Sequence, residues 1–188
     1  MSGFERFNKI LNLFSEKRSS LTVAEISEEL KIPSSTIYRT VREMVLADFL
    51  ESAAGSYFRL GQAFIKFNRI INLSDPLIQA GEPFLKKLAN ENPIPSTNIL
   101  ARLFGDKVMC VADFKYPSFK NNTSYQKGRL MPLLYGATSR AIIMQIKGKR
   151  LSDILNREGL NDDNQQKIFI SGLDEDKKKG FCKTEGQV

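Results

Sequence analysis

The chain has 188 residues, 41% of them hydrophobic, which is enough for one large or two small packed domains. It contains no histidine, the usual general base and the commonest transition-metal ligand, and only two distant cysteines, so we expect no enzyme, cofactor, metal site or disulfide framework. No apolar run reaches the roughly 20 residues of a membrane span, and no secretory signal is recognisable, so a cytoplasmic protein is expected.

The formal net charge of +7 is typical of proteins that bind nucleic acid, because cations release counterions from the phosphate backbone. However, residues 1–75 hold ten of the 28 basic residues and nine of the 21 acidic ones, so most of the excess positive charge lies in residues 76–188. An inference of DNA binding therefore depends on where individual cations fall.

Three helices and a β-hairpin are predicted in residues 1–61. Thr22 and Glu25 have the spacing of a capping box, which predicts the start of the second helix. Pro33 has a fixed φ and no N–H, which suits the first position of the third helix. The expected elements are a helix of about three turns from Phe4, helices at about 23–30 and 33–47, and hairpin strands at 49–51 and 57–60.

A broad apolar helix is expected in the segment 62–75, which is too hydrophobic for a free linker and is predicted to pack against another surface, such as a second subunit. Asp75-Pro76 marks a breakpoint, so 76–188 is assigned to a second domain. Its expected elements are a helix at 77–90, strands at 97–104, 108–114 and 129–134, a loop at 116–126, helices at 137–146 and about 151–156, and a polar stretch that ends at Gly180.

Two helices joined by a tight turn, with a hairpin after the second, follow one another in the order of a winged helix-turn-helix, whose second helix enters the DNA major groove. At about 100° per residue, the polar residues of the third helix share one face, opposite to its apolar residues. The expected DNA contacts are Ser34, Ser35 and Thr36 near the helix start, Tyr38, Arg39 and Arg42 in the groove, and Arg59 on the wing.

The sequence is also compatible with two other interpretations. Arg39 and Arg42 could be solvated cations on a winged helix that binds protein instead of DNA, a dimerisation module without specific DNA binding. An enzyme would need Cys110 or a lysine as its nucleophile, but the chain offers neither a histidine to activate the thiol nor a glycine-rich phosphate loop.

Five segments carry a resemblance to one family of transcription factors. They are 21–27, 32–39, 57–61, 127–133 and 136–141, with the sequences LTVAEIS, IPSSTIYR, YFRLG, KGRLMPL and GATSRA. The first two resemble the helix-turn-helix of the IclR (isocitrate lyase regulator) family. The other three resemble, in this order, the family's second wing strand, a glycine-arginine and proline-leucine strand, and a helix start. Departures are Ser139 and Arg140, where the family usually has glycine and lysine, and Leu134, where many members have histidine.

The resemblance implies an α+β fold with an N-terminal winged helix-turn-helix, a linker helix and a GAF-like α/β effector-binding domain. This last domain is expected to be incomplete, since residues 180–186 resemble a segment that normally precedes further strands and a closing helix. By resemblance, Leu134, Gly136, Ala137 and Thr138 border an effector pocket, although ordinary packing at a strand end and helix start explains them equally well.

The function implied is that of a sequence-specific DNA-binding regulator, most simply a repressor, with an activator as the alternative. The resemblance further implies a palindromic double-stranded operator, a small organic-acid or aromatic effector, and a dimer or tetramer paired through the N-terminal domain and linker helix.

Overall fold

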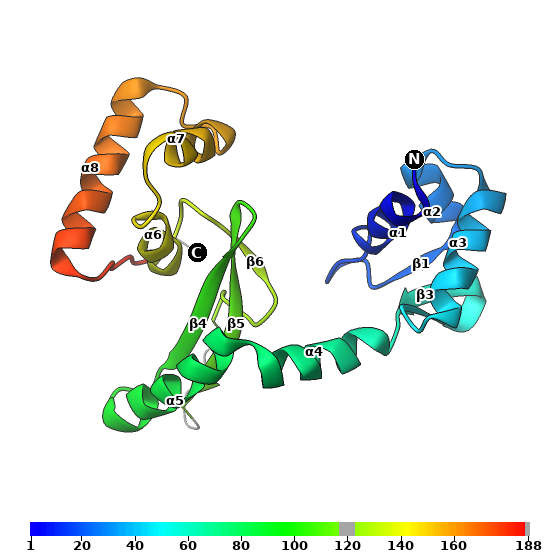
Figure 1. Ribbon diagram of the computed structural model, residues 1–188, viewed down its shortest axis with the longest axis horizontal. Helices are drawn as coiled ribbons and strands as arrows, with labels where there is room; N and C mark the ends of the chain where they lie inside the picture. The colour runs from blue at the N-terminus through cyan, green and yellow to red at the C-terminus, as the bar shows by residue number, and fades with distance from the viewer. Residues whose placement is uncertain (117–122, 187–188) are drawn as a thin grey trace. The chain divides into compact units, whose positions relative to one another are not determined.

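The computed structural model describes residues 1–116 and 123–186, and the chain divides into two compact units, Met1–Ser74 and Asp75–Val188 (Figure 1). Each unit combines helices with a small antiparallel sheet, which confirms the α+β class. Among the described residues, no helix is both long and apolar enough to cross a membrane.

The first unit is a winged helix-turn-helix followed by one more helix. Its helices are α1 (Gly3–Leu11), α2 (Val23–Leu30), α3 (Ser34–Leu46) and α4 (Ala63–Ser74), and its strands are β1 (Ser20–Thr22), β2 (Leu50–Ser52) and β3 (Tyr57–Leu60), with a short 3-10 turn at Ala54–Ser56. The strand order is β1-β3-β2. Strand β1 was not predicted, because the hydroxyl-rich approach to Thr22 resembles a loop and the partner strand lies far along the chain.

Helices α1 to α3 and the sheet share one hydrophobic core. Its fully buried members are Ile10, Leu21, Ile26, Ile37, Val41, Met44 and Leu50. The ring of Phe49 packs edge-on against Phe7 of α1 at 5.0 Å and also lies 5.7 Å from Phe64 and 6.0 Å from Phe67 of α4. One aromatic side chain therefore attaches α4 to the winged helix.

The predicted capping box at the start of α2 is present. The hydroxyl of Thr22 accepts the Glu25 N–H at 3.2 Å, and the Glu25 carboxylate accepts the Thr22 N–H at 2.7 Å. Thr22→Ala is expected to lower the free energy of unfolding of this unit by about 1 kcal/mol, because a backbone donor loses its acceptor. Urea unfolding measures this change. Thr22→Ser should retain most of the stability, and equal loss in both variants would contradict the prediction.

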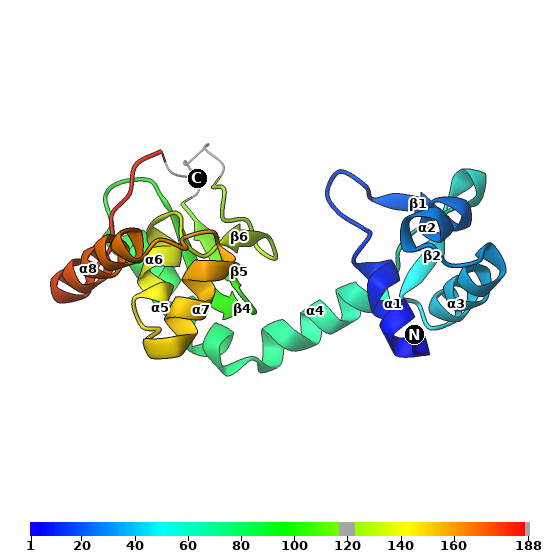
Figure 2. The same cartoon turned by 90° about the horizontal axis from the view of Figure 1, so that it is seen from above.

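The second unit has a three-stranded sheet of order β4-β5-β6 between helices. Its elements are α5 (Pro76–Glu91), β4 (Thr97–Phe104), β5 (Lys107–Lys115), β6 (Leu130–Pro132), α6 (Ala137–Ile143), α7 (Gly148–Arg157) and α8 (Asp163–Lys179). Helix α5 packs on one side of the sheet through Ile78 and Leu85 against Val111. The larger core joins Val108 and Cys110 to α6, α7 and α8, which lie together in Figure 2.

The structure corrects several predicted ranges in this unit. The strand expected at 129–134 is only three residues long, and the helix expected at 137–146 ends at Ile143. The polar stretch before Gly180 contains the 17-residue helix α8, in which Leu173 is the one buried residue and the apolar signal is correspondingly weak. Part of the loop expected at 116–126 lies outside the described residues.

Candidate nucleic-acid interface

Helix α3 has one buried and one exposed face, as predicted. Ile37, Val41 and Met44 are at most 2% exposed and pack in the core. Ser35, Tyr38, Arg39 and Arg42 are exposed on the other side, and Tyr38 keeps 59% of its surface. The structure therefore brings these polar side chains together on one free helix face.

The turn between α2 and α3 is held by side-chain hydroxyls. Lys31 has a left-handed conformation with φ 54°, which ends α2. The Ser27 hydroxyl donates to the carbonyl oxygen of Ile32 at 2.6 Å, and the Ser34 hydroxyl donates to Ser27 at 3.0 Å. Ser34, predicted as a DNA contact, thus has a structural partner in the turn.

The N-termini of α2 and α3 differ in their capacity to bind an anion. The α2 terminus is closed by Glu25, whose pKa is lowered by the hydrogen bonds from the backbone and side chain of Thr22. At α3 the preceding Pro33 offers no side-chain cap, so the first N–H groups, at Ser34 and Ser35, have no side-chain acceptor from the N-cap. Such groups and the helix dipole can bind a DNA phosphate.

The arginines predicted to bind DNA have different surroundings. Within the described ranges, neither Arg39 nor Arg42 forms an ion pair, so both guanidinium groups are available to a ligand. Arg59 instead pairs with Glu51, which lies directly opposite it across the β2 and β3 strands. Because neighbouring strand residues alternate and Phe58 packs toward the core, Arg59 lies on the outer face of the wing sheet, apart from the α3 cluster.

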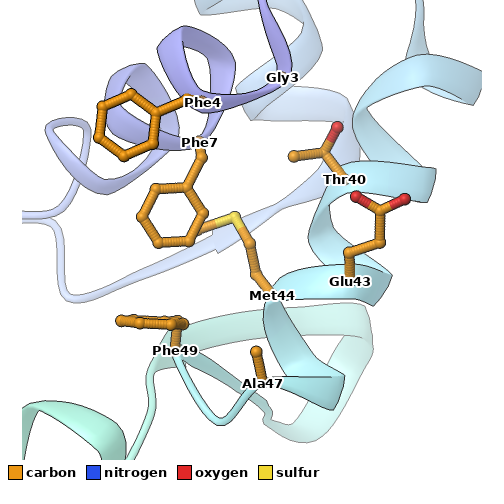
Figure 3. A pocket seen from close by; sticks show the side chains of 8 residues that line it. All are labelled: Gly3, Phe4, Phe7, Thr40, Glu43, Met44, Ala47 and Phe49. Atoms are coloured by element: carbon orange, nitrogen blue, oxygen red, sulfur yellow. The ribbon is translucent and has the colours of Figure 1, made fainter.

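Two hollows flank α3 and were not predicted. The smaller, about 210 Å³, lies between α3 and the wing and is lined by Tyr38, Val41, Arg42, Val45, Ser52 and Phe58. The larger, about 510 Å³, is mainly apolar and is lined by Gly3, Phe4, Phe7, Thr40, Glu43, Met44, Ala47 and Phe49 (Figure 3). Beside it, Arg6 of α1 donates from Nε to the Thr40 hydroxyl at 2.7 Å. No local pattern could have predicted this pair, since the residues are 34 positions apart.

The residues that resemblance assigned to an effector pocket lie around the start of α6. Leu134 is buried, Gly136 has φ 81° and precedes the helix, and Thr138 is half-buried. The N–H of Ala137 donates to the hydroxyl of Thr184 at 3.1 Å. A cavity of about 260 Å³ lies beyond the other end of α6, lined in part by Met144, Leu151 and Leu173. No group of metal-binding side chains occurs among residues 1–116 and 123–186.

Ser139 and Arg140, which depart from the family pattern, both fix α6 in place. The buried Ser139 hydroxyl donates to the carbonyl oxygen of Pro132 at 2.7 Å and lies 2.9 Å from the Tyr125 hydroxyl. Arg140 donates to Asp176 of α8 from Nη2 at 2.7 Å and from Nε at 2.9 Å, and its guanidinium lies 5.6 Å from the centre of the Phe169 ring.

Asp176→Asn should reveal the contribution of this ion pair. The hydrogen bond from Arg140 lowers the pKa of Asp176, so the stabilisation is present above the usual carboxyl pKa and is lost as pH falls through the lowered value. We expect the free energy of unfolding of the variant to be about 2 kcal/mol below that of the wild type at pH 7. On acidification the variant should lose less stability than the wild type does, because it lacks the carboxylate that titrates. Urea unfolding between pH 3 and 7 measures both effects.

The neighbouring Asp174→Asn is a matched control, because Asp174 is an exposed residue of the same helix and forms no ion pair in the described part of the chain. Identical pH profiles for the two variants would contradict the role given to the Arg140–Asp176 pair.

The fold and the polar face of α3 define a winged helix-turn-helix protein with a second, α+β domain. The sequence model of the IclR helix-turn-helix domain matches residues 5–53. The Pca regulon regulatory protein of Pseudomonas putida is 20% identical over 160 residues, which cover 85% of this chain and 54% of that protein. The chain thus spans about half the length of this curated relative.

Solved structures of IclR-family regulators have the same fold. The regulator of Alicyclobacillus acidocaldarius matches with a TM-score of 0.79 and 21% identity, over 99% of this chain and 76% of that one. The regulator of Brucella abortus matches with a TM-score of 0.76 and 16% identity, over 100% of this chain and 72% of that one. An IclR homologue of Microbacterium hydrocarbonoxydans, complexed with 4-hydroxybenzoate, matches with a TM-score of 0.71 and 20% identity. The match covers 95% of this chain and 75% of that one. The chain therefore combines an IclR helix-turn-helix domain with the IclR-family fold, which confirms the resemblance.

Proposed function

We propose that the protein is a cytoplasmic, sequence-specific DNA-binding transcription regulator, most simply a repressor, and not an enzyme. The observation that carries this proposal is the exposed face of α3, where Arg39 and Arg42 have no acidic partner among residues 1–116 and 123–186. Planar guanidinium groups can bind the O6 and N7 atoms of guanine with two hydrogen bonds.

The rest of the helix-turn-helix supports this docking. The uncapped N–H groups of Ser34 and Ser35 can bind a phosphate and so fix the position of α3 on the duplex. Thr36 and Tyr38 follow on the same helix as further contacts to phosphate or bases. Arg59 would reach the neighbouring backbone only by exchanging Glu51 for a phosphate.

We extend the proposal to an effector, a small organic or aromatic acid bound by the second unit. Support comes from the shared fold of the Microbacterium homologue, whose complex contains 4-hydroxybenzoate. Leu134, Gly136, Ala137 and Thr138 are the proposed border of that site.

We also propose a homodimer paired through α4, which would match a palindromic operator. Five apolar side chains of α4 are exposed in the single chain: Ile65, Phe67, Ile70, Ile71 and Leu73. Such a face is expected to associate. Ile65→Glu combined with Leu73→Glu should reduce the mass measured by sedimentation to the 21.3 kDa of one chain. Lys66→Glu, which changes charge alone, should leave the dimer intact, and a dimer that persists in the double variant would contradict this pairing.

The central proposal is tested by selecting duplexes from a randomised pool and measuring their binding by fluorescence anisotropy at several salt concentrations. We expect one enriched sequence to bind more tightly than a scrambled duplex, with an affinity that falls steeply as salt increases. No enrichment, or weak binding that is equal for both duplexes, would overturn the proposal and favour a protein-interaction module.

A further inference from the structure

Arg6 of α1 has unusual surroundings for a half-buried charge. Within the described residues, its guanidinium donates to a neutral group, the hydroxyl of Thr40, and forms no ion pair. Thr40 is 4% exposed, and its hydroxyl in turn donates to the carbonyl oxygen of Thr36 at 3.1 Å. A directional chain of hydrogen bonds thus runs from α1 to the first turn of α3.

Stability alone does not account for this arrangement. A threonine hydroxyl inside a helix is already satisfied by the carbonyl four residues earlier, so Thr40 does not require Arg6. Partial burial of a guanidinium beside a neutral acceptor carries a desolvation cost that an apolar side chain would avoid.

The packing beside Thr40 shows what the hydrogen bond contributes. Thr40 lines the 510 Å³ hollow between α1 and α3, so α1 leaves part of this flank of α3 uncovered beside the hydrogen bond (Figure 3). The other flank is held by the core through Val41. A helix with side chains has a radius of about 5–6 Å, so a rotation of roughly 10° displaces its surface groups by about 1 Å. Base-specific hydrogen bonds lose their geometry on that scale.

We propose that Arg6 is a positioning residue for base recognition: through Thr40 it sets the rotation of α3, and with it the aim of Arg39 and Arg42. This inference rests on the proposed function. Arg6 does not touch the DNA in this mechanism, so its loss reduces discrimination between sequences more than binding to DNA in general.

The test compares Arg6→Lys, Thr40→Val and Thr40→Ser in the full chain, with the enriched and scrambled duplexes as probes. Arg6→Lys keeps the charge and loses the planar Nε donor, whereas Thr40→Val keeps the shape and loses the acceptor. Each is expected to reduce the ratio of the two affinities by roughly three- to tenfold, while binding to the scrambled duplex changes less than twofold. Thr40→Ser keeps the hydroxyl and should retain the wild-type ratio of the two affinities.

The double variant Arg6→Lys/Thr40→Val should discriminate no worse than either single variant, since both act through one hydrogen bond. Circular dichroism confirms that each variant is folded at the assay temperature. If Thr40→Val does not fold, Arg6→Lys still carries the test.

Two results would overturn the positioning role. In the first, Arg6→Lys and Thr40→Val prefer the enriched duplex over the scrambled one as strongly as the wild type does, while Arg39→Ala loses this preference. The proposed function would then still hold. In the second, Arg6→Lys keeps the wild-type ratio of affinities, whereas Arg6→Met binds the enriched and the scrambled duplex more weakly by the same factor. That result would assign Arg6 to a direct phosphate contact. Failure of the proposed function is distinct, because the wild-type chain itself would then show no preference.

Discussion

Arg39→Ala and Arg42→Ala should each weaken binding to the enriched duplex by about 5- to 150-fold. The physical reason is the loss of a bidentate contact to a base, which is worth about 1–3 kcal/mol of discrimination. Lysine at either position should restore little of the loss, because a point charge cannot reproduce the planar pair of donors. Anisotropy titrations at fixed salt measure these ratios.

Lys9→Ala is the matched control for charge. Lys9 is an exposed cation of α1 that pairs with Glu5, and it lies outside the polar face of α3. Its removal should change the affinity less than twofold. If both arginine variants bind as the wild type does, with unchanged salt dependence, the arginines are solvated cations and the site assignment is wrong.

Gly61→Ala should destabilise the first unit more than any surface change. A Cβ at this position would lie 2.2 Å from the carbonyl oxygen of Asp48 and 3.0 Å from the carbonyl carbon of Leu50, both of them backbone atoms. The strand end cannot easily move away, because the Gly61 N–H donates to Phe49 at 2.8 Å. We expect a loss of about 3 kcal/mol and a melting temperature about 15 °C lower for this unit, measured by calorimetry.

Gly3→Ala provides the comparison, since a Cβ there would meet no atom within 4 Å. Its melting temperature should equal or slightly exceed that of the wild type, because alanine has the higher helix propensity. Similar melting temperatures for Gly61→Ala and Gly3→Ala would show that the segment around Asp48 yields at little cost.

Local signals explain which elements could be predicted. Helix α2 was predicted at Val23–Leu30 because Thr22 and Glu25 hold its start through bonds that span three residues. The two faces of α3 followed from helical periodicity alone. Strand β1 was missed because its pairing with β3 joins Leu21 to Phe58, a contact that no short window of sequence contains.

The same distinction applies to the candidate site. The sequence located the α3 cluster because its residues recur within one helix. It could not show that Arg59 is paired with Glu51, since β-pairing register decides which residues stand opposite. The contact between Arg6 and Thr40 and the hollow beside it depend on how α1 packs on α3, which no motif encodes.

The aromatic cluster around Phe49 has a consequence for how DNA recognition can evolve. The ring of Phe49 packs against both Phe7 of α1 and Phe67 of α4, and so connects the winged helix-turn-helix to the first turns of α4. In the proposed dimer, mutations on α3 would then alter which bases are preferred, whereas mutations farther along α4 would alter the distance between half-sites. The two properties could diverge independently among descendants of one ancestral regulator.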